Sequence, residues 1–529
     1  MRPGRRETQD PVEAGSTNVA RMAHVSGVIR DPNILFVFTD QQRADSLGAV
    51  NGWARTPHLD ALADEGVLFT SCFANAPVCI PSRFSLMSGL YPHNLGVQTN
   101  RPITYPTRLD TWVEVLRRSG YRTSLFGKLH LHPTQGDLRK RERLVRRFGF
   151  DDVDEVAGPR ALQACSTALT DQWERDGVRD AYRRDVAERY ANTPWIVRPS
   201  PVGLDLYYDT YVGRSAAAYL RGYDRPEPWF CYVGFPGPHE PWDTPEPWAS
   251  AYEPRTMPAP RAAPRSSGDR AVGGLDRRLH DRPDLSPGEI AALRADYAGG
   301  VSLIDDVIGE VLQVVRDRGE WDRTIVVFTS DHGEMNGDAG LLYKEVFLDG
   351  AVRVPLIIRD PTGCAGGEVA DPVELIDVGA TILDLAGRSD DATFRMGRSM
   401  AGVVRDPASP PPRTDVLSEL RGEVMLATAD WKIALNAEGE TYLLFRRSGD
   451  ESENLAGIEQ FEDIQRSMEH RVLRRLVATS TGDQVIAELQ RPSTTVATLL
   501  RRLAGDRRYD DLRVRLAAPL ARARHLVGR

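Results

Sequence analysis

The sequence predicts an α/β fold: a large, mostly parallel sheet sandwiched by helices, followed by a small antiparallel sheet and a helical tail. Short apolar runs typical of strands buried on both faces recur along the chain, at 33–39, 121–126, 229–235, 324–329 and 354–358. Stretches with helical patterning separate several of these runs. Strands that alternate with helices favour a parallel sheet covered by helices on both faces.

Start and stop signals mark the predicted helices. Residues 57–65 follow Thr56, with Pro57 in the first turn and Gly66 directly after the last residue. This is the usual placement of proline and glycine around a helix. Residues 108–119 repeat the pattern, and a longer helix is expected over 288–318, before the strand at 324–329.

The remaining stretches divide the chain into parts. Residues 133–200 are charged and irregular, and residues 253–287 are rich in Pro, Arg and Gly, so we expect two insertions, the second a long loop. A Pro-rich link precedes short strand-like runs that predict a small antiparallel sheet, at 415–420, 423–428, 431–436 and 441–445. The predicted parts are a disordered arm, the main α/β domain, a small β subdomain and a helical extension, at 1–30, 31–407, 408–456 and 457–529.

Composition excludes several classes of protein. With 41% hydrophobic and 27% charged residues, the 529-residue chain is an ordinary globular protein. A net charge of -8 argues against nucleic-acid binding, and no apolar stretch is long enough to span a membrane. Five scattered cysteines do not suit a disulfide framework, and the first 30 residues lack the apolar segment of a secretory signal. We therefore expect a cytoplasmic protein without nucleic-acid or membrane partners.

Lysine is scarce in this chain. Among 67 basic residues the only lysines are Lys128, Lys140, Lys344 and Lys432. Lysine and arginine are not interchangeable at tight or titrating sites, because the ammonium group is compact and the guanidinium is broad. A lysine retained against this bias is therefore a candidate functional residue.

Ionisable and amide side chains follow the predicted strands, at the point where each strand ends. Ligands of open α/β sheets bind outside the carboxyl ends of the strands. The sequence therefore predicts an active site built from several loops at one edge of the sheet. In chain order the side chains at these ends are Asp40, Gln41, Lys128, His130, His239, Asp331 and His332.

Cys79 directly precedes a predicted helix that Pro81 and Ser82 can open, so the helix dipole would favour negative charge there. Taken alone, a cysteine in this position is more often a small buried residue than a nucleophile. The spacing of Cys79, Pro81, Ser82 and Arg83, however, closely resembles the C-x-P-S-R signature of type I sulfatases, and the GLYPH run at 89–93 resembles its continuation. The resemblance implies that Cys79 is oxidised to formylglycine, whose hydrated aldehyde is the nucleophile.

The resemblance extends over roughly residues 32–455 and implies an alkaline-phosphatase-like fold with a metal site. Asp40, Cys79, Asp331 and His332 match the positions of the family's ligands to one divalent cation. Oxygen ligands suit Ca²⁺, with Mn²⁺ or Mg²⁺ as alternatives. Many sulfatases have a second acid after the first, whereas this chain has Gln41, which resembles the branch of choline sulfatases and phosphonate monoester hydrolases. Gln41 is expected beside the metal or the substrate.

The resemblance also implies roles for further residues. Lys128 and His130 fall on the family's G-K-x-H motif and His239 on its P-H-x-P motif, while Arg83 belongs to the C-x-P-S-R signature and Lys344 follows Asp331 at the family spacing. Arg83 and Lys128 would hold the formylglycine diol, and His130 would be the base that breaks the covalent sulfate ester. His239 would protonate the leaving alcohol oxygen or bind the sulfate. Lys344 would neutralise charge on the transferring group.

The leading hypothesis is a sulfuric ester hydrolase that cleaves a small-molecule sulfate monoester to alcohol and sulfate through a covalent intermediate on formylglycine. Asn100 matches a substrate-contacting position of the choline-sulfatase-like branch. The first alternative is a phosphonate monoester or phosphodiester hydrolase, a branch that has Tyr and Thr where this chain has Lys128 and His130. The second is a non-catalytic binding homologue with an unmodified Cys79. Maturation would need a formylglycine-generating enzyme as a partner, and the helical tail is compatible with a homo-oligomer.

Overall fold

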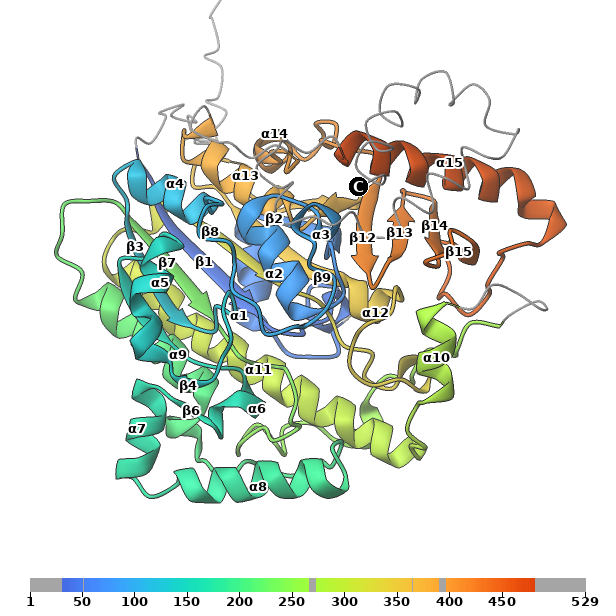
Figure 1. The fold of residues 1–529 in the computed structure, drawn as a ribbon. Helices are drawn as coiled ribbons and strands as arrows, with labels where there is room; N and C mark the ends of the chain where they lie inside the picture. The colour runs from blue at the N-terminus through green and yellow to red at the C-terminus, as the bar shows by residue number, and fades with distance from the viewer. Residues whose placement is uncertain (1–30, 51, 266–272, 364, 390–395, 481–529) are drawn as a thin grey trace, which may run out of the picture.

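The computed structural model describes residues 31–50, 52–265, 273–363, 365–389 and 396–480. They form a nine-stranded sheet in the order β10-β2-β9-β8-β1-β7-β3-β5, with β11 also paired to β2 (Figure 1). Strand β9 is antiparallel to both β8 and β2, and the other neighbours pair in parallel. The predicted mostly parallel sheet is thus confirmed. Its strands are β1 Asn33–Thr39, β2 Val67–Phe73, β3 Arg122–Gly127, β5 Asp152–Glu155, β7 Trp229–Gly234, β8 Thr324–Ser330, β9 Arg353–Arg359, β10 Gly367–Val369 and β11 Val373–Glu374.

Helices cover both faces of the sheet. Alternate side chains of β1 enter different cores: Ile34, Phe36 and Phe38 join one apolar cluster, whereas Leu35 and Val37 join the other. This alternation is the period-two geometry of a strand buried on both faces. The first cluster includes α2 Cys79–Ser88, α3 Pro92–Leu95, α4 Trp112–Arg118, α13 Asp377–Leu385 and α14 Ala401–Arg405. The second includes α1 Pro57–Glu65, α9 Tyr208–Arg221 and α11 Pro287–Asp317.

Helix ends follow capping side chains. The predicted helix at 57–65 is confirmed, and α11 starts one residue earlier than expected because Ser286 caps it by accepting a hydrogen bond from the Glu289 amide. Helix α4 is shorter than predicted because the Thr111 hydroxyl accepts from the Glu114 amide and so starts the helix at Trp112. Short helices at the connections are α12 Asp349–Val352 and the 3₁₀ turns η1 Ala44–Ser46, η2 Leu138–Arg141, η3 Leu204–Leu206, η4 Pro254–Thr256, η5 Trp321–Arg323, η6 Asp338–Gly340 and η8 Glu459–Phe461.

The expectation of an irregular insertion over 133–200 is wrong. This segment contains four helices, α5 Glu142–Arg147, α6 Pro159–Leu162, α7 Ala168–Arg175 and α8 Arg179–Asn192. It also contains the edge strand β5 of the main sheet and a small parallel ladder of β4 Gly136–Asp137 with β6 Cys165–Ser166. Trp173 and Tyr182 anchor α7 and α8 in the second core cluster. Sparse apolar residues within a charged stretch are enough to fix these elements, because they pack on an existing sheet.

The expected long loop over 253–287 is also interrupted, by η4 and by α10 Gly274–His280; residues 266–272 are outside the described part. The small antiparallel sheet is confirmed, in the order β12 Val416–Leu420, β13 Glu423–Ala427, β14 Trp431–Leu435 and β15 Thr441–Arg446. Helix α15 Glu462–Thr479 packs across this sheet (Figure 1) through Met468, Val472 and Leu476. The predicted arm at 1–30 and the tail after 480 lie outside the described residues. Among the described helices, none combines the length and apolarity that a membrane span requires.

Candidate active site

The carboxyl ends of the parallel strands bring the predicted site residues together. Asp40 directly follows β1, Lys128 follows β3, and Asp331 follows β8. These three residues are at most 3% exposed. The predicted active-site edge of the sheet is therefore a real cluster of charged groups in the interior, closed by α2 from one side.

Cys79 is the first residue of α2, after the extended residue Val78. The first turn of the helix is tied to the sheet, because the Ser82 hydroxyl donates to the Asp331 carbonyl at 2.6 Å. Asn100 accepts a hydrogen bond from the Ile80 amide at 2.8 Å, and its Nδ2 lies 3.5 Å from Cys79 Sγ. Asn100 is therefore an exposed amide next to the proposed nucleophile, although its contact with substrate stays a prediction.

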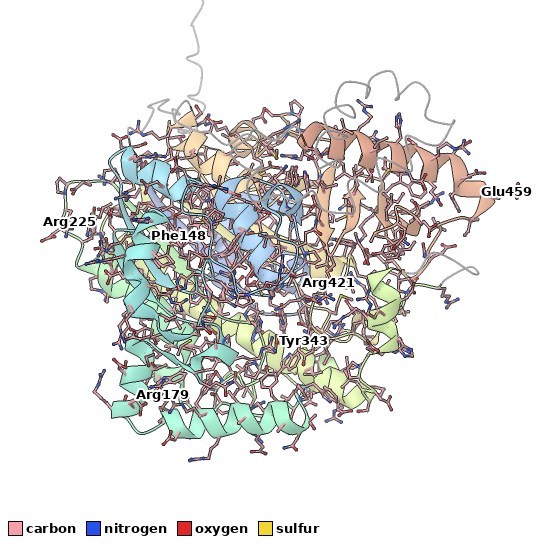
Figure 2. The ribbon with its side chains drawn as sticks, viewed as in Figure 1. Phe148, Arg179, Arg225, Tyr343, Arg421 and Glu459 are labelled. Atoms are coloured by element: carbon pink, nitrogen blue, oxygen red, sulfur yellow. The ribbon has the colours of Figure 1, made fainter. Side chains whose placement is uncertain are left out.

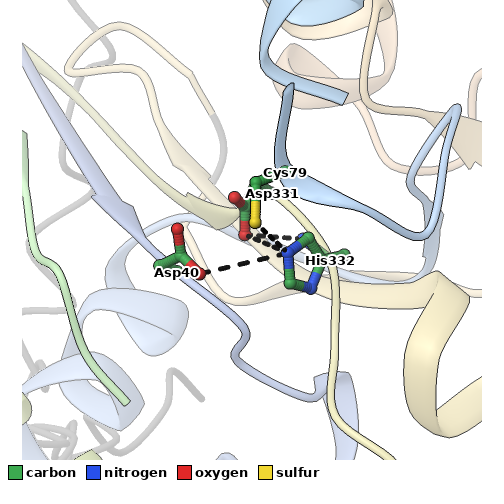
Figure 3. A group of neighbouring side chains, drawn as sticks. All are labelled: Asp40, Cys79, Asp331 and His332. Carbon is green, nitrogen blue, oxygen red and sulfur yellow. Dashed lines mark hydrogen bonds and ion pairs between the residues drawn. The ribbon is translucent and has the colours of Figure 1, made fainter. Parts of the chain in front are cut away.

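Four side chains form a cluster that could hold a metal ion: Asp40, Cys79, Asp331 and His332 each offer one ligand atom, and these atoms lie within 4.8 Å of one another (Figure 3). Cys79 Sγ is 3.1 Å from His332 Nε2, which is 3.5 Å from Asp331 Oδ1 and 4.0 Å from Asp40 Oδ1. The Nδ1 atom of His332 lies 2.9 Å from the Gly333 carbonyl. That contact favours the proton on Nδ1 and leaves Nε2 as a lone-pair donor, as in ligating histidines.

Two observations test whether these residues fit a cation. Asp40 Oδ1 is buried without a hydrogen-bond partner in the described part of the chain, and such an atom is costly unless something else satisfies it. Two carboxylates, an imidazole and the atom at the Cys79 position form a mixed donor set that suits Ca²⁺ or Mn²⁺. The cluster fits a divalent cation.

Arg83 spans the two carboxylates. Its Nε donates to Asp331 Oδ2 and its Nη2 to Asp40 Oδ2, both at 2.8 Å, and Lys128 Nζ lies 2.5 Å from Asp40 Oδ2. Burial and a charged Cys79 would raise the pKa of Asp40, but Lys128, His239 and Arg83 together lower it below its usual range. Asp40 is therefore ionised and available as a ligand.

Burial alone would raise the pKa of the Cys79 thiol, yet the charge of Lys344 and contacts with His332, His130 and His239 lower it well below the usual value. The site thus stabilises a negative atom at this position. Burial lowers the pKa of His130, which favours a neutral imidazole. His239 Nδ1 lies 2.7 Å from the Glu240 carbonyl and 3.1 Å from Glu240 Oε2, which orients its ring.

Gln41 contacts three charged groups, and two of them, Glu240 and Glu334, were not among the predicted site residues. Its Nε2 donates to Glu240 Oε2 at 2.8 Å and to Glu334, and its Oε1 accepts from the ammonium of Lys344. Gln41 therefore connects Lys344 to two buried acids, and its contact with substrate stays a prediction. Glu240 directly follows His239, so its position beside a motif residue was the available signal.

Comparison with known proteins agrees with this geometry. The family model described as Sulfatase matches residues 32–388. An arylsulfatase from Clostridium perfringens is 29% identical over 369 residues, covering 67% of this chain and 75% of that protein. A choline-sulfatase from Rhizobium meliloti is 27% identical over 378 residues, covering 68% of each chain.

Among solved structures, the phosphonate monoester hydrolase of Agrobacterium radiobacter superposes with a TM-score of 0.69 at 25% identity, covering 85% of this chain and 96% of that one. Choline sulfatases and phosphonate monoester hydrolases, the two kinds of protein in the branch that the sequence resembles, are thus both represented among the similar proteins. The family model covers more than half of the sequence, and the matched segment includes every residue of the cluster described above. The chain belongs to the sulfatase family.

Proposed function

We propose that this sulfatase-family hydrolase cleaves a sulfate monoester of a small alcohol to the alcohol and sulfate. The reaction would use a formylglycine made from Cys79 together with one divalent cation, for which Ca²⁺ is the first candidate. The observation that carries the proposal is the position of Cys79, at the start of α2 and 3.1 Å from His332 in a four-residue ligand cluster. The Sγ atom stands in for a hydroxyl oxygen of the hydrated formylglycine.

Formylglycine supplies the nucleophilic hydroxyl, and the cation, held by Asp40, Asp331, His332 and the residue at position 79, supplies Lewis acidity. Side chains of the protein would position these groups and transfer the protons. Arg83 keeps the two ligand carboxylates in place through one hydrogen bond to each. That arrangement costs no reorganisation during the reaction, because the guanidinium is already buried and paired.

Lysines and histidines complete the proposed chemistry. Lys128 and Lys344 place two ammonium groups within the site, where they offset the charge of a sulfate. His239, oriented through Nδ1, would donate a proton from Nε2 to the leaving alcohol oxygen. His130, whose lowered pKa keeps it neutral, would accept the proton when formylglycine is regenerated.

The second candidate function is hydrolysis of phosphonate monoesters or phosphodiesters. The structural likeness to a phosphonate monoester hydrolase favours it. Gln41 after Asp40 resembles choline sulfatases and phosphonate monoester hydrolases alike, so it is compatible with both functions. Against it stand Lys128 and His130, because a cationic group and a base suit release of sulfate from the enzyme. A non-catalytic homologue is disfavoured, since the complete ligand cluster and the C-x-P-S-R signature are retained.

The decisive experiment combines mass spectrometry with turnover. The chain is produced together with a formylglycine-generating enzyme, and the Cys79 peptide is expected to contain formylglycine. An aryl sulfate should then be hydrolysed faster than the matching aryl phosphonate, and Cys79→Ala should lose the activity. Full activity with an unmodified thiol contradicts the mechanism, and a phosphonate preference of several orders of magnitude replaces the proposed substrate. The proposed location is the cytoplasm, which fractionation of the native host checks.

A further inference from the structure

The segment between β5 and α6, residues 155–160, forms a wall of the active site. Glu155 pairs with Gly127 in the sheet, and the Val156 amide donates to the Gly127 carbonyl at 3.0 Å, one residue before Lys128. Gly158 passes so close to the site that a Cβ on it would lie 3.0 Å from Lys128 Nζ. The insertion therefore adjoins the catalytic lysine directly.

Arg160 extends from this wall to Glu240, the residue that directly follows His239. Its Nη2 forms an ion pair with Glu240 Oε1 at 3.0 Å, and its guanidinium lies 5.3 Å from the ring centre of Tyr190. Glu240 is the residue that orients His239 and receives a hydrogen bond from Gln41. Arg160 is thus one side chain away from the proposed acid of the reaction.

The two partners of this ion pair differ in exposure. The Glu240 side chain is 1% exposed, whereas the Arg160 side chain is 50% exposed. Glu240 is the one acidic partner of Arg160 within the described part of the chain, so the guanidinium keeps donors that face away from it. A guanidinium has five N–H groups in a planar fork that matches a carboxylate or sulfate.

Aromatic side chains line the same region. Tyr190 lies under Arg160, and the half-buried Tyr343, labelled in Figure 2, has its ring centre 5.6 Å from that of Trp242, three residues after His239. The Tyr343 amide also donates to Glu334, the second acid that holds Gln41. A ring in the leaving alcohol would find apolar surface here, with a cation beside it.

We propose that Arg160 is a specificity residue that binds a second anionic group on the leaving alcohol, so that the preferred substrates are sulfate esters of a ring bearing a carboxylate or a further sulfate. The inference rests on the proposed hydrolysis and deepens it. Glu240 pairs with one side of the Arg160 guanidinium and so fixes its position. The N–H groups on the other side stay available to hydrogen-bond an anion.

The test compares para-sulfooxybenzoate with its methyl ester, which has the same ring without the second charge. For the mature enzyme, the ratio of kcat/KM for the two esters should fall by about tenfold or more in Arg160→Gln, because a charge-assisted hydrogen bond is lost. The intrinsic reactivities of the two esters differ, but that difference cancels when the same pair is compared in both enzymes. Arg146→Gln is the matched control, because Arg146 is a half-exposed arginine of the same insertion with one carboxylate partner, Glu142.

A second measurement does not depend on turnover. In Cys79→Ala, the Kd values of the same two esters are measured by calorimetry with and without Arg160→Gln. Loss of the preference for the anionic ring supports the role of Arg160, and an unchanged ratio in both measurements overturns it. If neither ester is hydrolysed while the Kd preference depends on Arg160, the proposed hydrolysis fails and the anion site stands.

Discussion

Gly158 lies against the ammonium group of Lys128: a Cβ at Gly158 would be 3.0 Å from Nζ and 3.4 Å from Cε. Lys128 in turn lies 2.5 Å from Asp40 Oδ2. The absence of a side chain at Gly158 therefore leaves the space in which the Lys128 ammonium, a proposed catalytic group, contacts the carboxylate of Asp40, a proposed metal ligand. A substitution at Gly158 should therefore lower the rate of the reaction more than it lowers the stability of the fold.

Gly158→Val is expected to lower kcat by about tenfold or more, the order of loss seen when one positioned group in an active site is displaced. The control is Gly203→Val. Gly203 has a similar backbone, with φ -64 and ψ 161 against -62 and 157, also precedes a helix, and has open space where its Cβ would go. Steady-state kinetics and thermal melting are measured on both variants. Equal kcat in the two variants would refute the contact.

Metal removal should destabilise the protein. A ligand that binds the folded state alone, at about 100 times its Kd, adds about 2.7 kcal/mol to the free energy of unfolding. We therefore expect Ca²⁺ to raise the Tm of chelator-treated protein, and Asp331→Asn to abolish the shift. Asp305→Asn serves as control, because Asp305 is equally buried but accepts its hydrogen bonds from the amides of His58 and Leu59 at the start of α1. A shift that persists in Asp331→Asn places the cation elsewhere.

Lys344→Arg should reduce kcat although the charge is kept. The Lys344 ammonium is buried, and its contact with Gln41 Oε1 leaves little room for a broad guanidinium. Loss of one charge-stabilising donor costs about 100-fold in kcat. Lys432→Arg is the paired control, because Lys432, on β14 of the small subdomain, is also buried but pairs with Asp349 at the start of α12. Full activity of Lys344→Arg contradicts the assignment, and activity is measured alongside Tm so that misfolding is recognised.

Stability should fall as pH rises through the neutral range. Burial, with the nearby charge of Asp243, raises the pKa of Asp296 from 3.8 to about 8. Because the folded state holds the proton more tightly than the unfolded state, the stabilising contribution is complete below pH 3.8 and is lost as pH approaches 8. Asp296→Asn should therefore flatten the decline in unfolding free energy between pH 5 and 8, each pH unit being worth at most about 1.4 kcal/mol per group.

Chemical denaturation at three pH values across that interval measures the effect. The exposed Asp205→Asn, with 84% of its side chain accessible, controls for the change of net charge. If wild type and Asp296→Asn show the same slope, the Asp296 carboxyl is not the group that titrates.

The sequence by itself determined the sheet and most of the site. Short apolar runs identify strands such as β1 and β8 locally, and the shared edge of a parallel sheet then places Asp40 beside Asp331 without further information. The scarcity of lysine pointed in the same direction: of the four lysines, Lys128, Lys344 and Lys432 are buried and ion-paired or hydrogen-bonded, and Lys140 is exposed.

Only the tertiary structure decided how the insertion and the acids complete the site. Arg160 meets Glu240 eighty residues further along the chain, Gln41 joins Glu240 to Glu334, and Gly158 lies on Lys128. These contacts carry no local periodicity, because they depend on which loops a folded sheet brings to one edge and on space left by a missing side chain. A strand can be recognised from its own few residues, whereas the contacts between distant loops are set only once the whole sheet has formed.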